Sequence, residues 1–169
     1  LRGEYLYVAG GRDGFRVYDM ASIANKGVSQ GIITAPFSPL GQDSRVATRN
    51  ATCVALPTNQ PIHPPQNEGE LMRVENKERP FHPLYNYAFI TDAEEGLIVV
   101  DVNTFANGEP RDNDLKRALT WNPDGVLAGV RHITIGGRWF YLLTPTGLVV
   151  VDMDNPLQPR IAAKLSLDD

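Results

Sequence analysis

One phrase recurs three times in the chain: a glycine, four mostly apolar residues and an aspartate. Aligned on Gly14, Gly96 and Gly147, the copies read GFRVYD, GLIVVD and GLVVVD. A strand-like stretch and a short turn precede each copy, which is typical of a β-hairpin. We expect the glycine to start the returning strand where a permissive φ is needed, and the aspartate to end it by accepting backbone N–H groups. A hairpin written three times indicates a repeat architecture.

Other strand-like stretches surround these hairpins. Residues 130–137 precede the third hairpin, and the ranges 32–35 and 160–165 follow the first and the third. The consensus unit is therefore an inner strand, a hairpin of two strands and an outer strand. Four antiparallel strands per unit, repeated, predict an all-β fold, a β-propeller of four-stranded antiparallel blades.

The spacing of the units predicts an additional, degenerate blade. The second and third hairpins are about one blade apart, but the first and second are separated by about twice that length, so we assign the strands 45–49 and 52–56 to an intervening blade. An irregular, Pro-rich insertion follows over 57–85, in which 71–76 could finish that blade or open the next. Residues 113–121 fit one or two helical turns or an outer strand.

The whole chain, 1–169, is predicted to be one domain, a partial propeller of about three to four blades, because closed propellers usually need four to eight. It has no initiator methionine and no signal peptide, and we expect it to be part of a longer polypeptide. The ring would then be completed elsewhere or remain open.

Composition excludes several classes of function. The net charge is −4, so we expect no nucleic-acid partner. No apolar stretch approaches the roughly 20 residues of a membrane span. Cys53 is the one cysteine, and the absence of a C-x-x-C-H site predicts no covalently bound cofactor.

The second and third phrases, with their flanking residues, resemble a known repeat. The second phrase, 96–102, the stretch 147–165 with Pro156 and Pro159, and the strand that contains Tyr5 and Tyr7 are similar to the LVIVD repeat of bacterial and archaeal β-propellers. The first copy departs from the pattern with an aromatic residue after its glycine, and the second has a longer loop after its aspartate. The resemblance implies a propeller that is often exported, hence a periplasmic or extracellular location, and mostly without assigned activity. It also implies a multihaem cytochrome as a candidate redox partner.

Four residues are candidates for binding a ligand in the central channel. His132 and Arg131 are adjacent on the expected inner strand, where alternation sends their side chains to opposite sides. One of them could line the channel, although a packed or hydrogen-bonded histidine is the competing interpretation. Arg45 and Arg49, four apart on an expected strand, could bind an anion or could pair with neighbouring carboxylates.

Two acidic segments are candidates for metal binding. The turn with Asp92, Glu94 and Glu95 could bind a cation or a basic partner, or could simply be a solvated turn. The loop after the second hairpin also offers oxygen ligands, which calcium prefers. Its Phe105 breaks the EF-hand pattern, so a turn-rich surface insertion is the alternative. The candidate ligands in this loop are Asp101, Asn103 and Asp112.

The sequence contains no nucleophile elbow, phosphate-binding loop or dinucleotide fingerprint. We therefore favour a non-catalytic interaction scaffold that binds other protein chains, or the remainder of its own polypeptide, through a loop face. The alternative is a propeller enzyme, a hydrolase or an oxidoreductase, with a site in the central channel.

Overall fold

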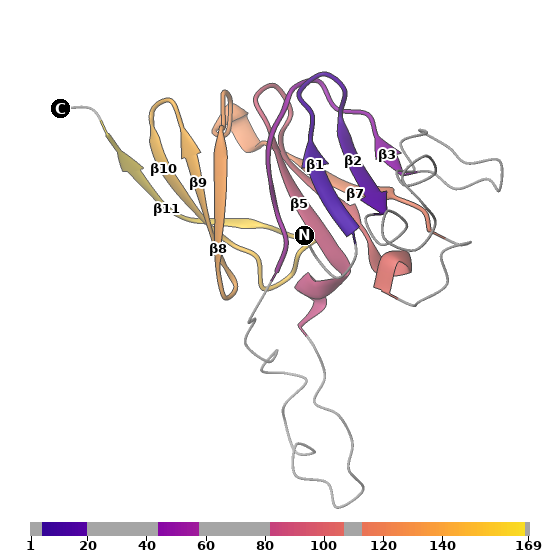
Figure 1. The fold of residues 1–169 in the computed structure, drawn as a ribbon. Helices are drawn as coiled ribbons and strands as arrows, with labels where there is room; N and C mark the ends of the chain where they lie inside the picture. Colours follow the sequence, from indigo (N-terminus) through magenta and orange to yellow (C-terminus); the bar gives the residue numbers. More distant parts are fainter. Residues whose placement is uncertain (1–4, 20–43, 58–81, 107–112, 168–169) are drawn as a thin grey trace, which may run out of the picture.

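The computed structural model describes residues 5–19, 44–57, 82–106 and 113–167. These residues form three antiparallel sheets; the sheet nearest the C-terminus lies at the left of Figure 1, and the other two lie to its right. The all-β class is confirmed, and the arrangement is consistent with a partial β-propeller.

The strands follow one another in the order that the repeat predicts. The first blade contains β1 (Tyr5–Ala9), β2 (Phe15–Asp19) and β3 (Arg45–Val46). The central blade contains β4 (Ala51–Ala55), β5 (Tyr87–Asp92), β6 (Gly96–Asp101) and β7 (Lys116–Trp121). The last blade contains β8 (His132–Gly136), β9 (Trp139–Thr144), β10 (Gly147–Asp152) and β11 (Arg160–Ser166). The described residues also contain three short 3-10 helices: η2 (Pro83–Asn86), η3 (Asn103–Ala106) and η4 (Pro123–Gly125).

The glycine of the repeated phrase has the predicted role. Gly96 has a φ of +88° and Gly147 a φ of +145°. A Cβ on Gly147 would lie 2.0 Å from the carbonyl oxygen of Leu165 in the outer strand. The position therefore needs glycine both for its φ and for the close approach of the neighbouring strand.

The aspartate of the phrase also behaves as expected in two blades. The Asp101 carboxylate accepts the N–H of Asn103 at 2.9 Å, and the Asp152 carboxylate accepts the N–H of Asp154 at 3.0 Å. Each of these side chains caps the turn that follows its strand.

The predicted degenerate blade over 45–56 is wrong. Its two strands belong to different blades, because β3 pairs with β2 and β4 pairs with β5. β3 is therefore the outer strand of the first blade, and β4 is the inner strand of the central one. The extra length between the first two hairpins lies between strands of the same blade, at 20–43 and 58–81.

Residues 113–121 provide β7, an outer strand, which settles the two alternatives for that segment. The stretches 32–35 and 71–76 lie outside the described residues.

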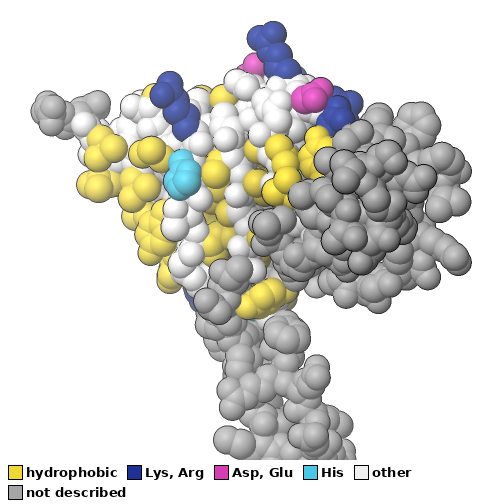
Figure 2. Space-filling model, viewed as in Figure 1, with side chains coloured by type: hydrophobic (Ala, Val, Ile, Leu, Met, Phe, Trp, Pro, Cys, Tyr) yellow, Lys and Arg dark blue, Asp and Glu magenta, His cyan; other side chains and the backbone are white. Residues whose placement is uncertain are grey.

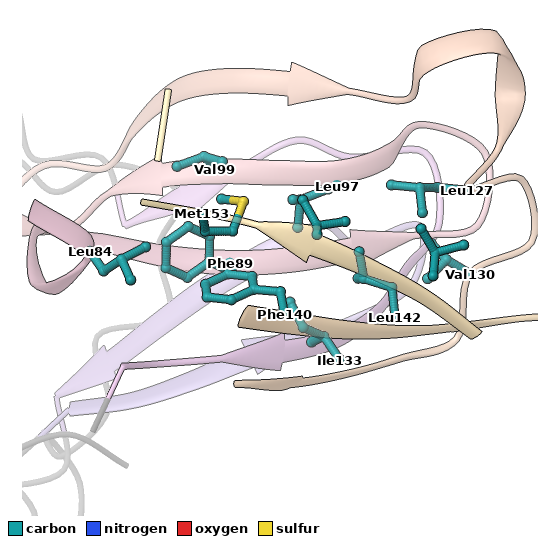
Figure 3. Close-up of a cluster of buried hydrophobic side chains, with 12 residues drawn as sticks. Leu84, Phe89, Leu97, Val99, Leu127, Val130, Ile133, Phe140, Leu142 and Met153 are labelled. Carbon is teal, nitrogen blue, oxygen red and sulfur yellow. The ribbon is translucent and has the colours of Figure 1, made fainter. Parts of the chain in front are cut away.

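The core lies between the blades. One cluster joins the first blade to the central one through Tyr7, Phe15 and Val17, which pack against Ile90 and Ile98. A second cluster joins the central blade to the last (Figure 3). Both faces of β5 and β6 are buried as a result, which explains why GLIVVD has no polar face.

Candidate functional site

The connections between strands gather at two ends of the blades. At one end the turn after β1 bonds to the start of β4, where Gly11 and Ala51 exchange backbone hydrogen bonds of 3.0 Å. Ala93 in the β5–β6 turn joins them, because its N–H donates to Asn50 and its carbonyl accepts from Gly129. The predicted loop face thus exists, with 47–50 as the connection between the first two blades.

Asp92 lies on this loop face but is fully buried. One carboxylate oxygen accepts the N–H groups of Glu94 at 2.8 Å and Glu95 at 2.9 Å, and the other accepts that of Asn50 at 2.6 Å. A carboxylate that receives three backbone N–H groups organises its own turn and fixes the neighbouring connection. Asp92 is therefore an internal cap of this turn and not a solvated surface carboxylate.

Of the other two acidic residues of the turn, one is paired and one is exposed to solvent. Glu95 forms an ion pair with Arg117 of β7 at 2.6 Å and also accepts the N–H of Arg49 at 2.9 Å. Glu94 is exposed. No three His, Cys, Asp or Glu side chains of the described part of the chain are grouped so as to hold a metal ion. A cation in this turn stays a prediction.

The second acidic segment begins at the opposite end of the central blade. Asp101 caps the turn at Asn103, which is exposed, and Asp112 lies outside the described residues. Calcium binding there also stays a prediction. Asp101 has a further effect, because burial and then the nearby Asp101 charge raise the pKa of the Tyr87 phenol.

The sequence predicted that Arg45 and Arg49 share one face of a strand, and this prediction is wrong. β3 ends at Val46, so Arg45 lies on the outer strand of the first blade and Arg49 lies in the connection to β4. The Arg45 side chain donates to the carbonyl of Asp13 at 2.8 Å. The expected strand 45–49 is cut short because the chain turns to start the next blade at Ala51.

The inner strands β4 and β8 bring together a group of three polar side chains, Cys53, His132 and Thr134. His132 is exposed on β8, and its Nδ1 lies 3.6 Å from the thiol Sγ of Cys53 on β4. Its Nε2 lies 3.3 Å from the hydroxyl of Thr134. Arg131, just before β8, is exposed, and its N–H donates to the carbonyl of Leu143. The imidazole thus lies between a thiol and a hydroxyl. In such an arrangement the imidazole can accept the proton of the thiol and so activate the sulfur as a nucleophile.

Sequence reasoning identified His132 but not its neighbours Cys53 and Thr134. Thr134 could have been found, because residues two apart on a strand share a side. Cys53 was missed because β4 was assigned to a different blade.

The last blade carries an apolar face that the loop-face expectation did not include. Every exposed large hydrophobic side chain among the described residues lies between Trp139 and Leu167. Figure 2 shows hydrophobic side chains gathered at the left of the molecule, over the strands labelled β8 to β11 in Figure 1. Four of them share one side of the sheet, and we call them the open face: Trp139, Tyr141, Leu143 and Leu165.

Register explains how the open face is built. Trp139, Tyr141 and Leu143 alternate with the buried Phe140 and Leu142 along β9. A strand that is apolar at every position is suited to burial on both sides. The described residues cover only one side of β9, the side with Phe140 and Leu142.

The family model of the LVIVD repeat matches residues 85–107, which contain the β5–β6 hairpin and η3. This match bears out the resemblance that the repeated phrase suggested. No curated protein and no solved structure gives a significant match. No helix in the described part of the chain has the length and apolarity to cross a bilayer.

Proposed function

We propose that this chain is a non-catalytic LVIVD-type β-propeller module that serves as a protein-interaction scaffold. The open face is the observation that carries the proposal. Leu165 is 60% exposed and Tyr141 38% exposed. Exposed apolar side chains that gather on one surface mark sites of protein association, whereas scattered ones need no explanation. Aromatic residues such as Trp139 and Tyr141 are also enriched in such interfaces.

The geometry supports a partner surface on the flat side of a blade. The loop face is largely occupied by its own turn: Asp92 is saturated with backbone N–H groups, and Glu95 is paired with Arg117. The open face presents rigid strands with their backbone already paired, so its association would order few additional groups. The partner would be another protein chain or a further part of the same polypeptide.

Hydroxyl-radical footprinting tests this function. The side-chain reactivity of Trp139, Tyr141 and Leu165 is compared between the isolated 169-residue chain and the same polypeptide in its native source material. We expect these three side chains to be protected in the native assembly. Phe140, buried in both states, is the internal control. Equal reactivity of the open face in the two samples would refute the proposal.

The family resemblance supports two further parts of the proposal, an extracytoplasmic location and a redox partner such as a multihaem cytochrome. Fractionation of the source cells, followed by detection of the chain, tests the location. Haem absorbance in the purified native assembly tests the partner. A cytoplasmic chain, or an assembly without haem, would remove the corresponding part and leave the scaffold proposal in place.

A second candidate function is a propeller enzyme, a hydrolase or an oxidoreductase, with its site at the inner strands. The contact between Cys53 and His132 favours it, since a thiol beside an imidazole can act as a nucleophile. The rate of Cys53 alkylation by iodoacetamide, measured against pH, tests it. His132→Ala should slow the reaction near neutral pH, and Thr134→Val should change it less. An unchanged rate in His132→Ala would count against this candidate.

A further inference from the structure

The hairpins of the central and last blades correspond residue by residue. Gly96 pairs with Asp92 at the turn of one hairpin, and Gly147 pairs with Thr144 at the turn of the other. Counting from the two glycines, Leu97 corresponds to Leu148 and Val99 to Val150. Each side chain of the last blade therefore has a counterpart whose surroundings are known.

The two interfaces between blades use the same pair of surfaces. We call the side of a blade with Phe89, Leu97 and Val99 its forward face, and it packs against Phe140 and Leu142 of the next blade. At the other interface the forward face of the first blade, with Tyr7, Phe15 and Val17, packs against Ile90 and Ile98 of the central blade. The receiving surface, which we call the backward face, contains Ala88, Ile90, Ile98 and Val100 in the central blade and Phe140, Leu142, Val149 and Val151 in the last blade.

The open face is the forward face of the last blade. Tyr141 occupies the position of Phe89, and the half-buried Leu148 and Val150 occupy those of Leu97 and Val99. Trp139 corresponds to Tyr87, which packs against the interface of the central and last blades. The last blade thus repeats, with apolar residues, a surface that is covered in both other blades.

We infer that the open face receives the backward face of a further four-stranded antiparallel blade, with uncharged apolar residues at the positions of Phe140, Leu142, Val149 and Val151. This inference rests on the proposed function and names the partner of the same surface. The geometry sets the register, because the incoming blade would place its second and third strands over β9 and β10 as the last blade does over β5 and β6.

A second copy of this chain is a poorer occupant. In the first blade, the position of Ile98 is taken by Arg16, whose side chain pairs with Asp13 at 3.3 Å. Docking that surface onto the open face would bring a guanidinium against Tyr141 and Val150, and burying this charged group costs more than burying the isoleucine that occupies the position in the central blade. The fitting partner is a blade without a charge at that position.

An extended chain tests the inference. A second copy of residues 122–169 is appended to the full chain, so that it supplies a backward face together with its connection. Trp121→Phe in the parent and Trp139→Phe in the added copy leave the original Trp139 as the only tryptophan. We expect the emission of Trp139 to move to shorter wavelength and to lose most of its acrylamide quenching relative to the unextended chain.

The matched control carries Phe140→Asp and Leu142→Asp in the added copy alone, and there Trp139 should be quenched as in the unextended chain. Circular dichroism shows whether the added copy gains strand structure. If it does not, a second extension with residues 44–121, carrying Trp121→Phe, repeats the test with a backward face that is already buried against the first blade.

Three outcomes would overturn the inference: Trp139 stays quenched in both extensions, the aspartate control protects it equally, or the unextended chain protects it as its concentration rises. The last outcome would make a second copy the occupant. Protection of the open face in native material, combined with no protection in either extension, would leave the proposed function standing and remove only the blade as partner.

Discussion

Replacing Phe140 with alanine is the most direct perturbation of the packing between blades. Phe140 is 0% exposed, and its ring meets that of Phe89 edge to face, with centroids 4.5 Å apart and an interplanar angle of 86°. The two rings come from the second strands of adjacent blades and lie at the middle of the interface cluster (Figure 3). Removing one ring leaves a cavity between two sheets, which cannot close without moving a whole blade.

The expected cost follows from burial and ring geometry. A buried Phe→Ala substitution removes about 3–5 kcal/mol of unfolding free energy. The edge-to-face pair should add a coupling of about 0.5–1.5 kcal/mol between Phe140 and Phe89 in a double-mutant cycle. Since small domains are stable by about 5–15 kcal/mol, the loss is a large part of the total.

Urea unfolding, followed by tryptophan fluorescence and circular dichroism, measures this cost. With a slope of about 2 kcal/mol per molar urea, the midpoint should fall by roughly 2 M. The matched control is Tyr141→Ala, an aromatic on the other side of the same strand that is 38% exposed. We expect the control to lose about 1 kcal/mol or less. If Tyr141→Ala cost as much as Phe140→Ala, the assignment of one buried and one open side to β9 would be refuted.

Three smaller predictions concern single positions. Gly147→Ala should cost more than about 2 kcal/mol in urea unfolding because its Cβ would strike the backbone of β11. The matched control is Gly125→Ala, with a φ of +71° and no atom within 4 Å of the new Cβ, which should cost roughly 1 kcal/mol. Equal costs of the Gly147 and Gly125 substitutions would contradict the steric argument. Asp92→Ala should cost about 1.5–3 kcal/mol because three backbone N–H groups lose a charged acceptor, and a neutral result would show that water replaces it. The raised pKa of Tyr87 means that the folded state holds the phenol proton longer than the unfolded state, so stability should fall as pH rises above 10.0. The difference between the absorbance titrations of the parent and of Tyr87→Phe isolates this phenol. Asp101→Asn should lower the pKa of Tyr87 but leave the effect of burial in place. A Tyr87 pKa at its ordinary value would contradict the burial of this phenol beside Asp101.

Local pattern was sufficient to predict the hairpins. Each one joins strands that are adjacent in sequence, and the repeated glycine fixes its register through a φ that other residues rarely adopt. Strand partners across long separations were not predictable in the same way. Arg45 and Ala51 are close in sequence, yet they belong to strands of different blades because each pairs with a hairpin beyond an insertion. A strand of two residues such as β3 leaves almost no pattern to detect.

The same limit applied to the candidate site. His132 could be placed on an inner strand because β8 directly precedes its hairpin. Its contact with Cys53 joins two blades, so it depends on the pairing of β4, which was misassigned. The burial of Asp92 was also hidden, because its third N–H donor, Asn50, comes from the connection between the first and central blades. Charge density along the sequence identified the acidic turn but not which carboxylate the fold would enclose.

The alternation in β9 leads to a last prediction, on the behaviour of the isolated chain in solution. If the open face contributes little to folding of this chain, the triple variant Trp139→Thr, Tyr141→Thr and Leu143→Thr should keep the fold, since threonine favours strands and the three side chains are already partly in water. The variant should bind less of the dye ANS and stay soluble at higher concentration, because an exposed apolar surface is removed.

The matched variant is Phe140→Thr with Leu142→Thr on the buried side of the same strand, which should unfold the chain. Far-UV circular dichroism and ANS fluorescence separate the two results. If the triple variant also unfolded, the open face would be part of the core of this chain itself, and the scaffold proposal would lose the observation that carries it. Retention of the fold with loss of the dye would show instead that β9 carries apolar residues on a side that this chain does not need for its own folding, which is the property expected of a surface that binds a partner.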